Sequence, residues 1–247
     1  MERFQSSGRL IAGVSFDIPG MGYKDPPTGA ITGFEADLAR ATGEKLFGAA
    51  DRVDLVQVMD AGRISALDEG RVDVVISQLT ITPDRAAEVD FSVPYLVTRE
   101  GLLVRKGSGI KGFDDLKGKR IVATAGSVSI RRMHGALSSL PGATLTSTPL
   151  SAGNVVAVER GDADAASNDM VNLTFLWKGA PDRDQYEIID IGDRFDPKPF
   201  GMAVKKGNTD LVTLLNGAIE SLKASGTIAG LLDAAIASVG AEETRKG

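Results

Sequence analysis

The stretch RVDVVISQLTITPDRAAEVDFSVPYL, residues 71–96, decides the fold. It opens with an apolar run rich in valine and isoleucine, which predicts a buried strand over 71–80. A helix is then expected, because Thr82 suits the N-cap, Pro83 the first helical position and Asp84 the first turn. A buried strand that leads into a helix is the repeating unit of α/β folds.

The same alternation extends in both directions from this stretch. It predicts strands at 9–16, 52–59, 99–108 and 119–126, and helices at 33–48, 61–70, 113–118, 127–140, 153–161 and 209–226. The pattern indicates an α/β protein with mainly parallel sheets. From residue 227 the chain is predicted to be helical before it ends in AEETRKG (241–247), which we expect to be disordered.

Composition excludes several classes of function. The 247 residues carry a net charge of −5, which disfavours a nucleic-acid-binding surface. There is no cysteine and only one histidine, His134, so a thiolate site, a histidine-based triad and a histidine-rich metal site are disfavoured. No apolar run is long enough to span a bilayer, which needs about 20 residues.

Two strand-to-helix turns, at 80–85 and 124–129, carry small hydroxyl residues. Ligands of open α/β sheets bind beyond the carboxyl ends of strands, where helix N-termini present free N–H groups. Two such turns facing each other would form a binding cleft between two lobes. Arg85 is notable because a cation in the first turn opposes the helix dipole, a conflict that a bound carboxylate would remove.

Each of these residues also has a structural interpretation. Arg85 would serve equally well in a salt bridge to Asp84, Glu88 or Asp90. Ser127 would serve as a plain N-cap. Asp169, a carboxylate after a strand of small residues, is also a suitable N-cap.

Familiar catalytic and nucleotide-binding motifs are missing or incomplete. GSGIKG (107–112) matches the glycine pattern of dinucleotide-binding folds, but the helix after it is too short and polar for that role. The sequence contains no P-loop, no H-E-x-x-H and no G-x-S-x-G. No cofactor and no metal are expected.

The chain resembles the family 3 solute-binding proteins that deliver polar amino acids to ABC transporters. The resemblance extends over about residues 9–230, and TITPDR (80–85) with DFSVPY (90–95) is its most specific part. The other matching blocks are GVSFDIPGMGYKDPPTGAITGFEADLA (13–39), LLVRKGSGIKGFDDLKGKRIVATAGSVS (102–129), GDADAASND (161–169) and PFGMAVKKGN (199–208). The subgroup most resembled binds glutamate, aspartate or glutamine.

The resemblance implies an α/β, two-lobed periplasmic-binding-protein-like fold of type II. A discontinuous lobe 1 would comprise 1–95 and 198–247, and lobe 2 would comprise 100–192. Two hinge strands, near 96–99 and 193–197, would connect them, with the ligand in the cleft between the lobes.

The resemblance also implies roles for individual residues. Arg85 would clamp the ligand α-carboxylate, and Thr80 would accept from the α-ammonium and donate to the carboxylate. Asp169 would bind the ammonium from lobe 2. Ser77 and Gln78 would supply adjacent contacts. Ser127, with the backbone at Val128, would hold the carboxylate from lobe 2.

The ligand side chain has its own expected partners. Acidic-ligand binders in this family carry an arginine where Arg63 stands, which favours a side-chain carboxylate, but they carry a lysine where this chain has Ser15. Lys24 or Arg99 would have to replace that lysine. Phe16 or Tyr23 is expected to cover the ligand.

The implied function is binding of glutamate, aspartate or glutamine by closure of the lobes, and delivery to a membrane permease. The protein would be a monomer, periplasmic or extracellular, free or lipid-anchored, with its leader absent from residues 1–247. Two alternatives remain open, namely the amino-acid-sensing domain of a receptor and a cyclohexadienyl-dehydratase-like enzyme on the same fold. The enzyme would need a general acid or base, and the sequence offers none beyond Asp169.

Overall fold

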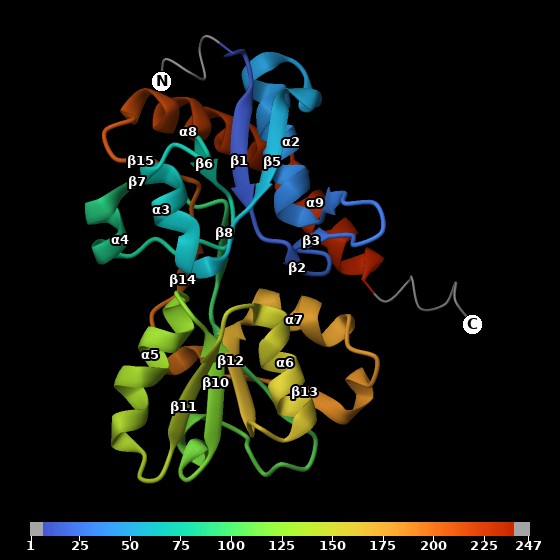
Figure 1. The fold of residues 1–247 in the computed structure, drawn as a ribbon, viewed down its shortest axis with the longest axis vertical. Helices are drawn as coiled ribbons and strands as arrows, with labels where there is room; N and C mark the ends of the chain where they lie inside the picture. Colours follow the sequence, from blue (N-terminus) through green and yellow to red (C-terminus); the bar gives the residue numbers. More distant parts are fainter. Residues whose placement is uncertain (1–6, 240–247) are drawn as a thin grey trace. The chain divides into compact units, whose positions relative to one another are not determined.

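The computed structural model describes residues 7–239, and its chain divides into two compact units. Unit 1 comprises Met1–Val97 and Pro199–Gly247, and unit 2 comprises Thr98–Lys198. Each unit contains one five-stranded sheet with helices packed against it (Figure 1). The α/β class is therefore confirmed, while the segment AEETRKG lies outside the described residues.

The sheet of unit 1 has the strand order β5-β1-β6-β15-β7. Its strands are β1 (Leu10–Val14), β5 (Val53–Gln57), β6 (Val74–Val75), β7 (Val89–Phe91) and β15 (Ala203–Lys205). β1 pairs in parallel with β5 and β6, whereas β15 pairs antiparallel with β6 and β7. Four of the five strands therefore run in the same direction, as predicted for a mainly parallel sheet, and β15, which comes from the returning chain, runs against its neighbours.

The helices of unit 1 bury their apolar faces against this sheet and against one another. They are α2 (Phe34–Phe47), α3 (Arg63–Asp68), α4 (Pro83–Glu88), α8 (Thr209–Ala224) and α9 (Thr227–Ser238), with short 3-10 turns η1 (Ala50–Arg52) and η2 (Asp60–Gly62). α2 contacts both α8 and α9. Phe34, Leu38 and Leu215 are fully buried, so they anchor this helical layer to the core.

A small three-stranded sheet was not predicted from the sequence. It comprises β2 (Asp17–Ile18), β3 (Gly22–Lys24) and β4 (Ile31–Thr32), in a segment whose glycines and prolines favour a loop. Gly22 is required there, because a Cβ would lie 2.3 Å from the Ser15 hydroxyl oxygen. The sheet follows β1 directly, so it holds the chain that leaves the carboxyl end of that strand.

The sheet of unit 2 has the order β11-β10-β12-β9-β13. Its strands are β9 (Glu100–Arg105), β10 (Arg120–Thr124), β11 (Thr144–Thr148), β12 (Ala165–Asp169) and β13 (Tyr186–Asp190). β10 pairs in parallel with β11 and β12, and β9 pairs antiparallel with β12 and β13. This sheet is also mixed, because β9 enters unit 2 against the direction of the parallel strands.

Three helices connect the strands of unit 2. They are α5 (Val128–Ala136), α6 (Ser151–Arg160) and α7 (Met170–Lys178), with the 3-10 turns η3 (Phe113–Leu116), η4 (Leu137–Ser139), η5 (Arg183–Gln185) and η6 (Gly192–Arg194). α5 connects β10 to β11, and α6 returns past β10 to β12. Right-handed crossovers in opposite directions place these two helices on opposite faces of the sheet. α7 was not predicted.

The chain passes between the units twice. β8 (Leu96–Thr98) leads out of unit 1 and β14 (Lys198–Phe200) leads back, and the two strands form a separate two-stranded sheet. Phe200 then pairs with Thr80 in an isolated antiparallel bridge inside unit 1. The returning chain is thereby attached to the segment that follows β6.

Candidate functional site

The segment after β6 turns away from the sheet much earlier than the sequence predicts. A strand was expected over 71–80, but β6 ends at Val75. Gln78 has φ of 41°, a left-handed conformation that a glutamine adopts only under constraint, and this interrupts the extended chain. The consequence is a buried loop, Ser77–Leu79, at the carboxyl end of the strand.

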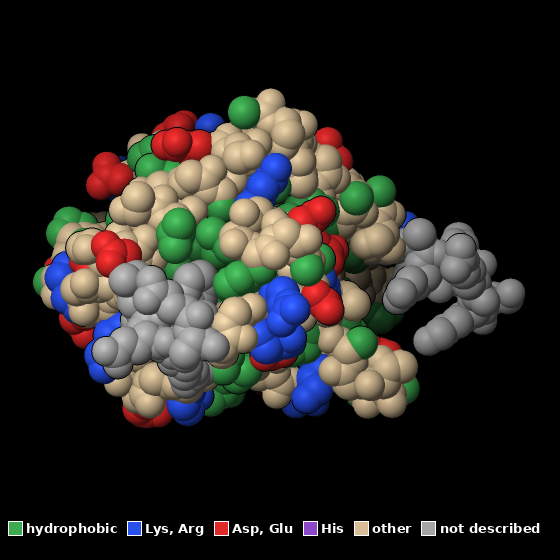
Figure 2. Space-filling view, turned by 90° about the horizontal axis from the view of Figure 1, so that it is seen from above, with side chains coloured by type: hydrophobic (Ala, Val, Ile, Leu, Met, Phe, Trp, Pro, Cys, Tyr) green, Lys and Arg blue, Asp and Glu red, His purple; other side chains and the backbone are tan. Residues whose placement is uncertain are grey.

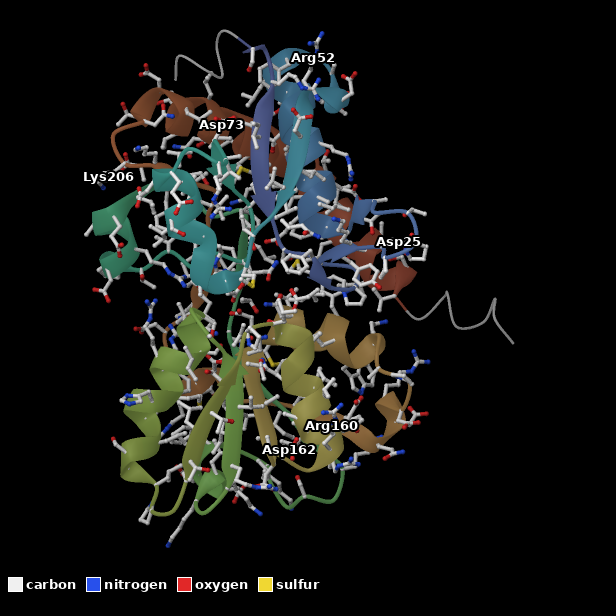
Figure 3. All side chains as sticks on the ribbon, in the orientation of Figure 1. Asp25, Arg52, Asp73, Arg160, Asp162 and Lys206 are labelled. Atoms are coloured by element: carbon white, nitrogen blue, oxygen red, sulfur yellow. The ribbon has the colours of Figure 1, made fainter. Side chains whose placement is uncertain are left out.

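At the first predicted turn, the capping interpretation of Thr82 is confirmed. Its hydroxyl accepts the backbone N–H of Arg85, and Pro83 occupies the first turn of α4. Arg85 itself is only 4% exposed, and its Nη1 donates to the Thr80 carbonyl oxygen at 2.9 Å. Of its predicted salt-bridge partners, Asp90 pairs instead with Lys206, labelled in Figure 3, at 2.8 Å. The structure thus brings Thr80 and Arg85 together.

Gln78 is held by three side-chain contacts. Its backbone N–H donates to Glu35 Oε1 at 2.7 Å, and its amide nitrogen donates to Ser15 Oγ at 2.9 Å and to Glu35 Oε2. The Ser15 hydroxyl therefore already has a partner, Gln78. These contacts explain how the unfavourable φ at Gln78 is maintained.

Arg63 is one of the largest fully buried side chains in the described residues. Its Nη1 donates to the carbonyl oxygens of Ser77 at 2.6 Å and Gln78 at 3.2 Å. Its Nε donates to the Asp60 carbonyl oxygen, and its Nη1 lies 3.4 Å from the Asp60 carboxylate. The Arg63 side chain therefore stabilises the loop Ser77–Leu79 by binding two of its backbone carbonyl oxygens.

Glu35 is the residue in this region that sequence reasoning missed. Burial raises its pKa to about 7, although hydrogen bonds from Tyr95 and Gln78 and the charge of Arg63 oppose that shift. Tyr95 donates its hydroxyl to Glu35 Oε1 at 2.5 Å, and the pKa of Tyr95 lies well above its usual value, mainly because of burial. In the sequence Glu35 looks like an ordinary first-turn acid of a helix, which gives no sign of this network.

Of the predicted aromatic residues, Tyr23 lies on β3 of the three-stranded sheet and Phe16 directly precedes β2. Phe16 and Tyr23 are half-buried, and the Phe16 carbonyl oxygen accepts the backbone N–H of Lys24 at 3.0 Å. Lys24, a candidate replacement for a pocket lysine, follows Tyr23 on β3. The other candidate, Arg99, forms an exposed ion pair with Asp190 at 2.8 Å.

In unit 2 the second predicted turn begins α5. Ser127 is the N-cap, and its Oγ accepts the backbone N–H of Ile130 at 3.1 Å, which confirms the capping interpretation. Gly126, with φ of 80°, makes the turn that precedes it. Ser127 and Val128 are buried, at 6% and 7% exposure.

Asp169 is the last residue of β12 and lies at the N-cap position of α7, but its side chain makes no capping hydrogen bond. Its Oδ1 lies 3.0 Å from Nζ of Lys198, and its Oδ2 lies 3.5 Å from the amide nitrogen of Asn172. Because β10 and β12 are adjacent and parallel, Asp169 and Ser127 both lie at the carboxyl ends of these strands. Unit 2 therefore has its own cluster of polar side chains.

Sequence reasoning also missed Lys198 and Glu100. Both are fully buried, and Lys198 Nζ lies 2.7 Å from Glu100 Oε2 and donates to Ser129 Oγ at 2.7 Å. In the sequence Lys198 stands in a proline-containing turn and Glu100 beside an arginine, so both look like surface charges. Only the fold brings them to Asp169.

In residues 7–239, no group of three histidine, cysteine, aspartate or glutamate residues is placed to hold a metal ion. His134 is exposed on α5. Figure 2 shows acidic and basic side chains interspersed on the face viewed, and no helix of the described chain is long and apolar enough to cross a membrane.

A hollow of about 300 Å³ lies in unit 2 near the amino-terminal ends of β10 and β12, away from Ser127 and Asp169. Its lining includes Arg105, Lys119 and Asp164, close to Arg160 and Asp162, which Figure 3 labels. Arg105 is already bound to the Glu159 carbonyl oxygen, and Asp164 to Arg120. This hollow shares no residue with the polar clusters at the two strand-to-helix turns.

Comparison with known proteins identifies one family. The model of the bacterial extracellular solute-binding proteins, family 3, matches residues 10–238. The chain is 30% identical to the ABC transporter glutamine-binding protein GlnH of Bacillus subtilis over 90% of this chain and 79% of the relative. It is 31% identical to the glutamine-binding protein of Geobacillus stearothermophilus over 83% and 76% of the two chains.

Solved structures give the same fold. An ancestral arginine-binding protein bound to arginine superposes with a TM-score of 0.81 and 32% identity, covering 92% of this chain and 97% of its own. The ancestral amino acid-binding protein AncCDT-1, a precursor of cyclohexadienyl dehydratase, gives a TM-score of 0.83 and 29% identity over 95% and 98% of the two chains.

Proposed function

Because the chain belongs to the bacterial extracellular solute-binding proteins of family 3, we propose that it binds a free polar L-amino acid and delivers it to the permease of an ABC transporter. The family is one of solute-binding proteins, and the relatives named for an amino acid include glutamine binders. The polar clusters after β6 in unit 1 and after β10 and β12 in unit 2 would each hold one part of the ligand.

The observation that carries this proposal is a pair of buried opposite charges, Arg85 in the first turn of α4 in unit 1 and Asp169 at the end of β12 in unit 2. A zwitterion taken out of water needs both of its charges paired. Arg85 with Thr80 would hold the α-carboxylate, and Ser127 with the Val128 N–H would add to it. Asp169 would hold the α-ammonium through the carboxylate oxygen that does not face Lys198.

The preferred ligand is proposed to be glutamine, glutamate or aspartate. The contacts of Arg63 favour a role in positioning Ser77 and Gln78 over direct contact with a ligand carboxylate. With Ser15 already bound to Gln78, the absence of a lysine there favours the neutral side chain of glutamine. Phe16 and Tyr23 remain the proposed aromatic cover.

The proposed setting follows the family. The protein would act as a monomer in the periplasm or outside the cell, free or tethered by a lipid. Charge-assisted hydrogen bonds contribute about 1.5–3 kcal/mol each, and ordering costs offset part of that sum. We expect a dissociation constant in the micromolar range, which corresponds to a binding free energy of about −8 kcal/mol.

Calorimetric titration with each common amino acid tests the proposal. We expect Arg85→Ala and Asp169→Ala each to weaken binding by about 30-fold or more, because each leaves one ligand charge without a partner. Arg71→Ala, which breaks the exposed Arg71–Glu69 pair, is the matched control and should bind like the parent. Parent-like affinity in either site variant would refute the assignment of that residue.

A second function, catalysis as a dehydratase, is favoured by one observation, the likeness to a precursor of cyclohexadienyl dehydratase. Incubation with prephenate and with arogenate tests it directly. Product formation that Asp169→Asn abolishes would support the enzyme, and absence of turnover together with amino-acid binding would support the transport protein.

A further inference from the structure

Lys198 occupies an unusual place in the chain. It is the last residue of unit 2 and the first of β14, the strand that returns to unit 1, yet its side chain is fully buried. Its ammonium group has three oxygen partners within 3.0 Å, namely Glu100 Oε2, Ser129 Oγ and Asp169 Oδ1. The contact with Ser129 is a hydrogen bond, and the contacts with the two carboxylates are ion pairs.

The three partners come from three different elements of unit 2. Glu100 begins β9, Asp169 ends β12 and Ser129 lies in the first turn of α5. Arg132 of α5 adds a second cation, with Nη1 3.9 Å from Glu100 Oε2. Two carboxylates thus face two cations, which makes this buried cluster neutral overall.

Neutralising Glu100 would not require the contact with Asp169. The charge of Glu100 is already balanced by Lys198, and Arg132 faces the same carboxylate oxygen. The ion pair with Lys198 instead holds Asp169 Oδ1 at the carboxyl end of β12, while Oδ2 faces Asn172. A carboxylate fixed in this way is oriented before a ligand arrives, which lowers the cost of ordering on binding.

We propose that Lys198 is a positioning residue of the amino-acid site: its ammonium, held by Glu100 and Ser129, orients the Asp169 carboxylate toward the ligand's α-ammonium. This role rests on the proposed function. Because Lys198 also begins the strand that leaves unit 2, a displacement of β14 would be transmitted to Asp169 through one side chain.

Two variants separate positioning from charge balance. Lys198→Met removes the ammonium that faces both Glu100 and Asp169, so we expect a lower melting temperature and at least tenfold weaker amino-acid binding. Lys198→Met with Glu100→Gln removes one charge of each sign. It should recover most of the melting temperature but keep the tenfold loss of affinity, because Asp169 still lacks its ammonium partner.

Calorimetry and thermal unfolding of the full chain decide between the roles. Recovery of parental affinity in the double variant would overturn the proposal, since Lys198 would then only neutralise Glu100. Arg120→Met, which breaks the exposed Arg120–Asp164 pair in the same unit, is the matched control and should change neither affinity nor melting temperature beyond one or two degrees.

A ligand-free double-mutant cycle separates failure of this proposal from failure of the proposed function. Lys198→Met should lower the melting temperature less in an Asp169→Asn background than in the parent, because one of its ion pairs is already gone. Equal losses in both backgrounds would overturn the Lys198–Asp169 coupling even if amino acids bind. A parent that binds no amino acid would instead overturn the proposed function, and with it the role of Lys198 toward a ligand.

Discussion

Gln78 shows how one residue shapes the proposed binding loop. Its φ of 41° is costly for a side chain with a Cβ, by about 1–2 kcal/mol, but contacts with Glu35 and Ser15 hold it there. A glycine would adopt the same backbone without strain. The hydrogen bonds of Gln78 therefore offset a backbone strain that glycine would not have.

Two substitutions at Gln78 measure that strain. Gln78→Ala and Gln78→Gly both lose the side-chain hydrogen bonds, and only the alanine retains the Cβ that opposes a positive φ. We expect Gln78→Gly to be about 1 kcal/mol more stable than Gln78→Ala, despite the greater entropy of unfolded glycine. Urea unfolding of both variants checks this, and an alanine variant as stable as the glycine variant would show that the loop relaxes.

Glu35 should make stability depend on pH. Burial raises its folded pKa to about 7 from 4.5, so the folded state binds the proton more tightly than the unfolded state. The contribution to stability is fully present below pH 4.5 and is lost as the pH rises through 7, by about 3 kcal/mol at most. The pKa of neighbouring Tyr95 lies well above its usual value because of burial, so Tyr95 keeps its proton over this window.

The variant Glu35→Gln isolates that contribution. The free energy of unfolding of the parent minus that of the variant should fall as the pH rises from 4.5 to 7 and then level off. Urea titrations at half-unit intervals of pH provide the measurement. A difference that stays constant with pH, or rises, would mean that Glu35 remains ionised throughout, held by its hydrogen bonds from Gln78 and Tyr95.

At the scale of elements, α3 stabilises the loop after β6 through its first residue. Arg63 begins this helix and donates to the carbonyl oxygens of Ser77 and Gln78. A buried carbonyl that loses its donor costs about 1–3 kcal/mol. The helix would therefore contribute to the proposed site by positioning this loop.

Substitution of Arg63 distinguishes stabilisation of the loop from direct contact with the ligand. We expect Arg63→Met to lower stability by about 2 kcal/mol and to weaken glutamine and glutamate binding to the same extent, because the loop serves both ligands. Chemical unfolding and calorimetry with the two amino acids test this. A loss confined to glutamate would instead place the Arg63 guanidinium on the ligand's side-chain carboxylate.

The elements also show what sequence reasoning can reach. Strong local signals worked: Thr82 and Ser127 cap the helices that their positions predict, and the apolar runs form strands. Signals that depend on distant residues failed. Glu35 meets Gln78 across 43 positions, β6 is cut short by that contact, and Lys198 meets Ser129 across 69. The direction of β9 and β15 likewise depends on where the chain enters each sheet.

At the scale of the whole molecule, unit 2 is a continuous insertion into unit 1. The chain enters through β8 and returns through β14, and the residues proposed to hold one ligand are divided between the units, Arg85 in one and Asp169 in the other. A ligand bound by both would couple the units, and two connecting strands allow a hinge motion on binding.

Small-angle X-ray scattering tests that coupling. The radius of gyration of the parent should fall when a saturating amino acid is added, because a ligand that binds groups of both units selects the more compact arrangement. Arg85→Ala and Asp169→Ala should show no change at the same ligand concentration, since each removes one of the two attachments. A radius that stays constant while calorimetry reports full binding would mean that the ligand is held without a detectable change in compactness. In either case the bound amino acid stabilises the protein against heat by mass action, by about 2.7 kcal/mol at one hundred times the dissociation constant.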